Sequence, residues 1–93
     1  MSDKTQVVVG IDVSKAALDV AVLPSSEVLQ VANDANGIEA LVKKFRSEAV
    51  DLVVMEATGG YETAVAAALV GSGLRVAVVN PRQIRDFAKA TGR

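Results

Sequence analysis

Asp12 and Glu56 are the residues whose type and placement best support chemistry. Asp12 closes a strand expected over residues 6–12, and Glu56 closes another expected over residues 51–56. If these strands are parallel neighbours, both carboxylates lie where α/β sheets bind ligands, at the carboxyl ends of the strands. Two carboxylates there repel each other unless a cation lies between them, and such a pair suits two-metal phosphodiester chemistry. The alternative, which the residues alone leave open, is that Asp12 caps its own turn and Glu56 faces solvent.

The composition restricts the chemistry to oxygen ligands and a few basic groups. The chain has no cysteine and no histidine, so disulfides, thiolate and imidazole ligands, and Ser-His or Cys-His pairs are excluded. Ser14, two residues after Asp12, has no base in reach and is a poor nucleophile candidate. Carboxylates prefer hard cations, so the expected cofactor is Mg²⁺ or Mn²⁺.

Other residues expected near the same edge have a functional and a structural interpretation. Asp19, on the second strand, is either an indirect contact of the metal or an ordinary surface residue. Gly59 and Gly60 open a helix and could offer their N–H groups to a phosphate. A tight turn that needs glycine geometry is the favoured interpretation of this pair.

Four residues are candidates for nucleic-acid contact: Lys15, Tyr61, Arg82 and Arg85. Tyr61 could stack on a base, although packing against the sheet is favoured. Arg82 and Arg85 lie on the exposed side of the last expected helix, where a solvated helix face is the favoured alternative. The net charge of -1 argues against strong nucleic-acid binding by this chain alone.

Three strands with tight connections are expected first, over residues 6–12, 17–23 and 28–32, and their short turns imply antiparallel pairing. The nearly continuous apolar run of the first strand predicts burial on both faces. Asn36, with Glu39 three residues later, resembles a capping box that starts an amphipathic helix.

The second half of the chain alternates strands and helices. The pattern predicts a buried strand over residues 51–56 and a helix over residues 61–70 that is ended by Gly71 and Gly73. A strand over residues 74–79 and a last helix from Asn80 onward follow. A helix between strands favours a parallel, right-handed crossover. The predicted fold is therefore α/β, with helices on a mixed five-stranded sheet in the order 3-2-1-4-5. This order resembles the RNase H-like fold and the core of the actin-like ATPases.

The whole chain, residues 1–93, is expected to form a single domain. Hydrophobic residues make up 51% and aromatic residues 3%, which predicts an aliphatic core. Neither a secretion signal nor an apolar run of about 20 residues is present, so a cytoplasmic location without a membrane partner is expected.

Three stretches together resemble the N-terminal domain of the DEDD transposases of the insertion-sequence one-ten family. They are residues 10–15 (Gly-Ile-Asp-Val-Ser-Lys), 55–62 (Met-Glu-Ala-Thr-Gly-Gly-Tyr-Glu) and 79–92, which begins Val-Asn-Pro-Arg-Gln. The resemblance implies a RuvC-like, RNase H-type catalytic domain that cleaves DNA strands in transposition. It also implies four metal-binding acids, Asp-Glu-Asp-Asp, of which Asp12 matches the first and Glu56 the second.

The same resemblance implies that the third and fourth acids follow the Ala-Thr-Gly-Arg segment at which this sequence stops. We therefore expect the chain to be a truncated domain that is inactive alone. DNA, and for some members a guide RNA, are the implied partners of the full-length protein. Two alternatives stay open: an actin-like ATPase or phosphotransfer domain, and a non-catalytic module that self-associates as a homo-oligomer.

Overall fold

The computed structural model describes residues 6–80. The elements of this part follow the predicted order: β1 (Val8–Val13), β2 (Ala17–Leu23), β3 (Glu27–Ala32), α1 (Ala35–Ser47), β4 (Leu52–Glu56), α2 (Thr63–Gly71) and β5 (Val76–Val79). The last helix predicted from Asn80 onward, with Arg82 and Arg85, lies outside the described residues.

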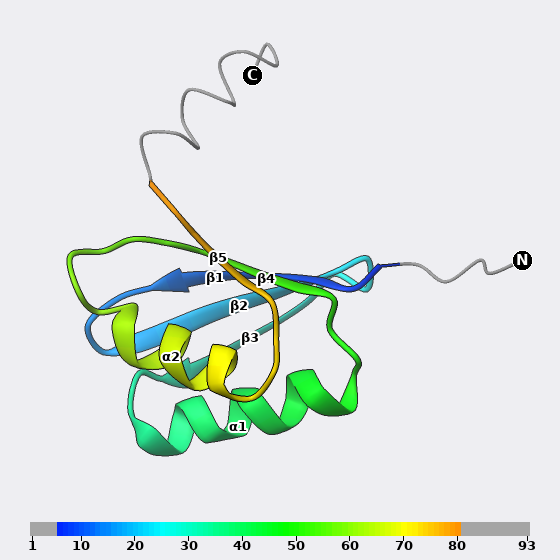
Figure 1. Cartoon of the computed structure of the whole chain (residues 1–93), viewed down its shortest axis with the longest axis horizontal. Helices are drawn as coiled ribbons and strands as arrows, with labels where there is room; N and C mark the ends of the chain where they lie inside the picture. Colours follow the sequence, from blue (N-terminus) through cyan, green and yellow to red (C-terminus); the bar gives the residue numbers. More distant parts are fainter. Residues whose placement is uncertain (1–5, 81–93) are drawn as a thin grey trace, which may run out of the picture.

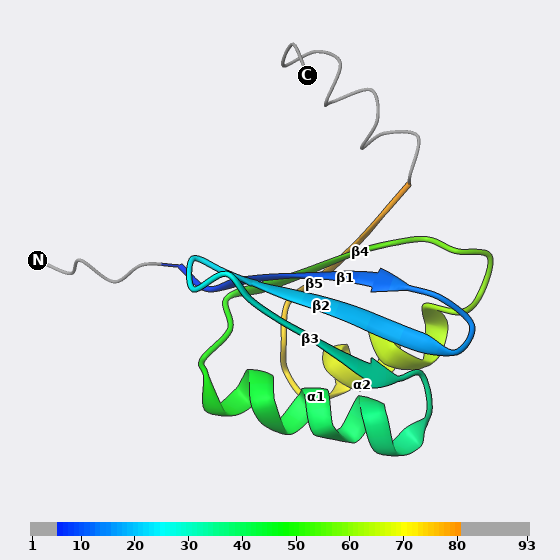
Figure 2. The ribbon, with the colours of Figure 1, turned by 180° about the vertical axis from the view of Figure 1, so that it is seen from behind.

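The five strands form one sheet in the order β3-β2-β1-β4-β5, which confirms the predicted topology. β1, β2 and β3 are antiparallel neighbours, whereas β4 pairs in parallel with both β1 and β5. β1, β3, β4 and β5 therefore end at one side of the sheet, which we call the carboxyl edge. The turn after β1, the connection after β3 and the loop after β4 lie together there (Figures 1 and 2).

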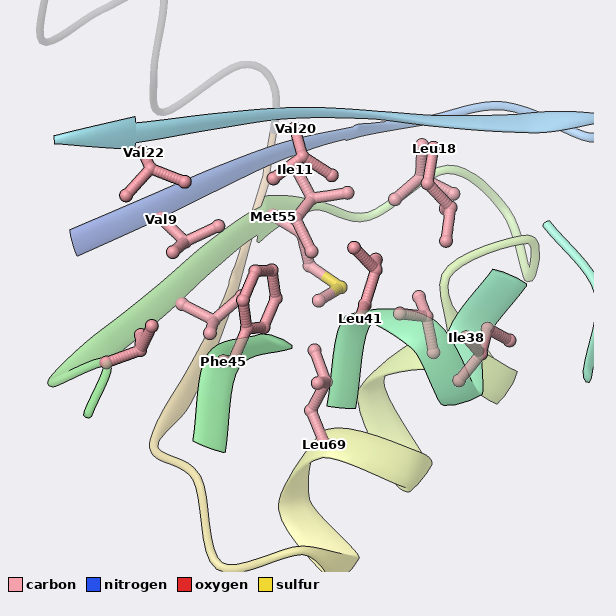
Figure 3. Close-up of a cluster of buried hydrophobic side chains, with 14 residues drawn as sticks. Val9, Ile11, Leu18, Val20, Val22, Ile38, Leu41, Phe45, Met55 and Leu69 are labelled. Carbon is pink, nitrogen blue, oxygen red and sulfur yellow. The ribbon is translucent and has the colours of Figure 1, made fainter. Parts of the chain in front are cut away.

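Both described helices cover the same face of the sheet (Figures 1 and 2). α1 is amphipathic and buries Ile38, Leu41 and Phe45, and α2 buries Val65 and Leu69. These side chains pack on the inward residues of β1, β2 and β4 (Figure 3). Phe45 is the one aromatic residue in this cluster of the described chain, as the predicted aliphatic core requires.

The opposite face of the sheet, which we call the open face, carries no described helix. Val9, Ile11 and Val13 of β1 are buried against the helices, whereas Gly10 and Asp12 are exposed. The prediction that β1 is buried on both faces is therefore wrong for the described residues. The reason is that α1 and α2 pack on one side, so only every second strand residue is covered.

α1 is capped two residues earlier than the Asn36 and Glu39 pattern predicted. Asp34 is the N-cap, and its Oδ1 accepts a hydrogen bond from the Gly37 N–H at 2.8 Å. Gly37 is needed there because a Cβ would clash with the carbonyl oxygen of Ala32 at the end of β3. This close approach places the first turn of the helix directly against the carboxyl edge.

α2 begins at Thr63, two residues later than predicted, and β5 likewise begins at Val76. The prediction that glycines end α2 is confirmed. Gly73 has a φ of 87°, and the N–H of Leu74 donates to the Leu69 carbonyl at 3.1 Å, which closes the helix.

Candidate functional site

Asp12 and Glu56 lie on adjacent strands at the carboxyl edge. The parallel pairing of β1 and β4 ends at Ile11 and Met55, and Asp12 and Glu56 are the next residue of each strand. Because Ile11 and Met55 face the core and side chains alternate along a strand, both carboxylates project from the open face. The prediction that Asp12 ends its strand is wrong by one residue, because β1 stays paired with β2 up to Val13.

A row of polar side chains crosses the open face at this level. Asp12 faces Asp19 on β2, and Asp19 faces Gln30 on β3. Gln30 Nε2 donates a hydrogen bond to Asp19 Oδ1 at 2.7 Å. Together with Glu56, these residues form the acidic row: Gln30, Asp19, Asp12 and Glu56. Asp19 therefore does lie beside Asp12, as expected, but its carboxylate has a partner within the protein.

The acidic row borders a hollow of about 690 Å³ on the open face. Besides the row itself, it is lined by Gly10, Ala21, Val28 and Val54, and by Ile11, Val20, Leu29 and Met55, which belong to the core or pack against it. No basic residue of the described chain lines it. Any positive charge that a phosphate or the carboxylates need must therefore enter from outside this hollow.

Asp12 and Glu56 differ from every other acidic residue in the described part of the chain. The others each have a partner: Asp19 with Gln30, Glu27 and Glu48 with Lys44, Asp34 with the Gly37 N–H, Glu39 with Lys43, Asp51 with the Val7 N–H, and Glu62 with Thr58 and Gly60. Within residues 6–80, no hydrogen bond or ion pair engages the carboxylate of Asp12 or Glu56. The two unpaired acids are thus the two that lie next to each other.

The alternative that Asp12 caps its own turn is not what the structure shows. Ser14 makes those contacts instead: its Oγ donates to the Ala17 carbonyl at 3.0 Å and accepts from the Ala17 N–H at 3.2 Å. Ser14 is therefore occupied in closing the turn after β1. Asp12 is left with no local structural task among the described residues.

Glu62 organises the loop between β4 and α2. Its Oε1 accepts hydrogen bonds from the Thr58 N–H at 2.9 Å, the Thr58 hydroxyl at 2.8 Å and the Gly60 N–H at 3.1 Å. These bonds, led by the one from the Thr58 backbone, lower the pKa of Glu62 to about 2. Gly59 and Gly60 have φ values of 79° and 125°, as the tight-turn interpretation requires. The Gly60 N–H already donates to Glu62, so in this arrangement it is not available to a phosphate.

The candidates for nucleic-acid contact are only partly described. Lys15 is exposed in the turn after β1, close in sequence to Asp12. Tyr61 is 49% exposed, so about half of its surface is accessible among the described residues. Arg82 and Arg85 lie outside the described residues. Of the described basic residues, Lys15 is the one that follows a strand at the carboxyl edge.

The donor set fits a divalent ion in kind but is incomplete in number. Two carboxylates match the hard oxygen ligands of Mg²⁺ or Mn²⁺, and Mg²⁺ commonly uses one or two carboxylates together with waters. Among residues 6–80, no group of three or more acidic side chains is placed to hold an ion. Asp12 and Glu56 therefore suit part of a ligand set that needs further oxygen donors.

Asn33 and Glu62 are contact-forming residues that the sequence did not single out. Asn33 Nδ2 donates to the carbonyl oxygens of Ser14 at 2.9 Å and Tyr61 at 3.1 Å, although it is 19 and 28 residues away from them. Its position directly after a strand was the one local signal. For Glu62, an acid two residues after Gly-Gly was a signal for a loop contact.

No helix of the described chain is long and apolar enough to cross a membrane.

Two solved structures share this fold. RuvC of T. thermophilus in complex with a Holliday junction substrate is 18% identical, with a TM-score of 0.66, over 88% of this chain and 69% of that one. A second structure of Thermus thermophilus RuvC is 20% identical, with a TM-score of 0.59, over 86% of this chain and 65% of that one. At such identities the likeness concerns the fold, and it confirms the predicted RuvC-like, RNase H-like arrangement.

The family comparison covers nearly the whole chain. No curated protein matches the sequence. Residues 9–93, which include Asp12 and Glu56, match the family model of the DEDD transposases of the IS110 type, described as transposase. The prediction of a transposase domain is thereby confirmed, and the chain belongs to this DEDD transposase family.

Proposed function

We propose that Asp12 and Glu56 are two of the metal-binding carboxylates of a DNA-cleaving centre. The observation that carries the proposal is their isolation: within residues 6–80 they are the acidic side chains without a partner, and they lie side by side. Adjacent carboxylates that no protein group neutralises favour a cation between them. The transposase family and the RuvC-like fold agree with this assignment.

A divalent ion bound there, Mg²⁺ or Mn²⁺, supplies charge stabilisation of the phosphodiester and a water of lowered pKa. The chain's own contribution is positional. β1 and β4 hold the two carboxylates on neighbouring strands, and both project from the open face, where a large substrate can approach. Asp19, held by Gln30, adds negative charge beside Asp12 without competing for the same position.

DNA is the proposed substrate, because the family is that of transposases and RuvC has been solved with a Holliday junction. Lys15 and Tyr61 are proposed to contact it: Lys15 by charge, and Tyr61, which is half-exposed, by stacking on a base. Arg82 and Arg85 are proposed phosphate contacts from the segment after β5. A guide RNA and self-association stay predictions. A role on DNA agrees with the predicted cytoplasmic location.

We further propose that residues 1–93 form one RuvC-like domain, to whose metal site Asp12 and Glu56 contribute. Two carboxylates do not complete the ligand set of a two-metal site. The 93-residue chain is therefore expected not to cleave DNA by itself. Metal-dependent cleavage by the purified chain, absent in Asp12→Asn, would contradict this expectation while supporting the role of Asp12.

The direct test is amide NMR of the chain during titration with Mn²⁺, whose paramagnetism broadens signals near its binding site. We expect broadening centred on Asp12 and Glu56, lost in Asp12→Asn and in Glu56→Gln. Asp51→Asn is the matched control, because Asp51 is an acid at the opposite end of β4 that is bound to the Val7 N–H. Absence of broadening in the wild type, or equal broadening in all four proteins, would refute the metal site.

A further inference from the structure

Asn33 occupies a central place at the carboxyl edge. It follows β3 directly, and its N–H donates to the Ala16 carbonyl at 3.0 Å, which continues the pairing of β2 and β3 by one residue. Its backbone is therefore fixed to the sheet. Its side chain points from this anchored position toward the two connections that follow β1 and β4.

The Asn33 amide joins these two connections. Its nitrogen carries two hydrogens, and the structure uses it for two acceptors: the carbonyl of Ser14, two residues after Asp12, and the carbonyl of Tyr61, five residues after Glu56. An aspartate of the same shape has only acceptor oxygens when ionised and cannot replace these bonds. The contact therefore depends on the amide and not merely on a polar side chain.

The position of this link matters because the backbone pairing of β1 and β4 ends just before the two acids. The last paired residues are Ile11 and Met55. Beyond them β1 is held by β2 up to Val13, and Glu56 is paired with β5. Asp12 and Glu56 thus lie between the last backbone contact of their two strands and the bridge that Asn33 makes farther along.

Each connection is held by its own hydrogen bonds. Ser14 closes the turn after β1 through both its N–H, which donates to the Ala17 carbonyl at 2.9 Å, and its hydroxyl. The loop after β4 is held by the three hydrogen bonds to Glu62 Oε1. A displacement at either end of the Asn33 bridge therefore moves a short, internally bonded segment that is covalently continuous with Asp12 or Glu56.

We propose that Asn33 is a positioning residue of the acidic site: its side-chain amide ties the segment after Asp12 to the segment after Glu56 and thereby sets the relative placement of the two carboxylates. This role rests on the proposed metal-binding function of the pair. Asn33 itself does not touch the metal or the DNA in this proposal.

The first arm of the test needs no metal. Amide NMR of the 93-residue chain compares the wild type with Asn33→Ala, Asn33→Asp and the control Asn36→Ala, which alters an exposed asparagine in the first turn of α1. The probe is Glu62→Gln, introduced into each background. In the wild type and in Asn36→Ala it should shift the amide signals of Ser14 and Lys15. In both Asn33 variants these shifts should disappear, because the bridge between the two segments is gone.

The second arm measures Mn²⁺ affinity by the broadening at Asp12 and Glu56. Residues that orient metal ligands typically change affinity by about 10–100-fold when altered, so both Asn33 variants should bind Mn²⁺ about tenfold or more weakly. Asn36→Ala should bind as the wild type does. Measuring the midpoint of urea unfolding for each variant confirms that the comparison is made between folded proteins.

The outcomes separate the two proposals. The response of the Ser14 and Lys15 signals to Glu62→Gln is the coupling between the two segments. Lost coupling in the Asn33 variants, together with weakened Mn²⁺ binding, supports the positioning role. Lost coupling with unchanged Mn²⁺ affinity overturns it and leaves Asn33 as a structural tie between loops. Coupling that survives in the Asn33 variants overturns it as well. If the wild type binds no Mn²⁺ at Asp12 and Glu56, the metal function fails and the positioning role falls with it, while the first arm still reports whether the bridge exists.

Discussion

Replacing Asp12 by Asn should stabilise the metal-free protein. Asp12 faces Asp19 directly across β1 and β2, Glu56 lies on its other side, and no described group neutralises it. Facing residues on neighbouring strands place like charges about 6 Å apart, where two unit charges in water repel by about 0.7 kcal/mol. Glu56 adds a similar contribution, and salt reduces both. We expect a gain of about 0.5–1 kcal/mol, or about 2–8 °C in Tm.

Asp51→Asn provides the matched opposite case. Asp51 Oδ2 accepts a hydrogen bond from the Val7 N–H at 2.7 Å, so this carboxylate has a structural partner. A hydrogen bond to a charged group contributes about 1 kcal/mol more than one to a neutral group, so the amide should lower stability by about that amount. The same chemical change at Asp12 and at Asp51 is thus expected to shift stability in opposite directions.

The measurement is thermal and urea unfolding followed by circular dichroism at low ionic strength, repeated at high salt. The gain from Asp12→Asn should shrink as salt screens the repulsion, whereas the loss from Asp51→Asn should change less. If Asp12→Asn lowers stability at low salt, Asp12 has a structural partner in the folded protein. That result would refute both the repulsion and the description of Asp12 as unpaired.

Three further predictions concern the fold around the site. Gly37→Ala should destabilise the protein by about 2 kcal/mol, because a clash of up to about 3 kcal/mol with the end of β3 outweighs a gain of about 1 kcal/mol in helix propensity. Gly71→Ala, with open space around the glycine, should be neutral or stabilising in the same urea titration. Glu62 has a lowered pKa, so its contribution to stability is full above about pH 4.5 and is lost as the pH falls toward 2. Glu62→Gln should remove that part of the acid dependence of stability, and identical profiles of stability against pH in the two proteins would contradict this prediction. Leu69→Ala, fully buried, should cost about 2–5 kcal/mol, against less than about 0.5 kcal/mol for Val70→Ala, which is 58% exposed; comparable losses would contradict the burial of α2.

The sheet topology could be predicted from the sequence because its signals are local. Apolar runs of strand length, short polar turns and helices between strands restrict the connections to few arrangements. The approximate level of Asp12 and Glu56 follows from the same signals, since each comes at the end of an apolar run. Parallel neighbours then bring the two acids to one edge.

The boundaries that failed depend on contacts between distant segments. The capping box at Asn36 was plausible locally, but the approach of Gly37 to the Ala32 carbonyl determines where α1 begins. Burial on both faces was expected of β1 because its composition is apolar. Which face the helices cover is a property of the assembled layers and cannot be obtained from one strand.

The most informative feature of the site, which acids have partners, was also invisible in the sequence. Asn33 reaches Ser14 and Tyr61 across 19 and 28 residues, and Asp51 reaches Val7 across 44. Such pairings depend on side-chain positions to within a few tenths of an ångström. The sequence could offer Asp12 and Glu56 as candidates, but could not distinguish them from acids that serve the fold.

That distinction gives the assignment of the site its physical basis. A fold gains stability when its carboxylates are paired with N–H groups or cations, and the described chain does this at Asp19, Asp51 and Glu62. At Asp12 and Glu56 it instead places like charges together where the pairing of β1 and β4 has ended. If the pair binds a divalent ion as proposed, repulsion between the two carboxylates disfavours the metal-free fold and is relieved when the cation binds. The end of the β1–β4 pairing, with Asn33 bridging the chain beyond it, therefore brings both acids to the place where the proposed ion would bind.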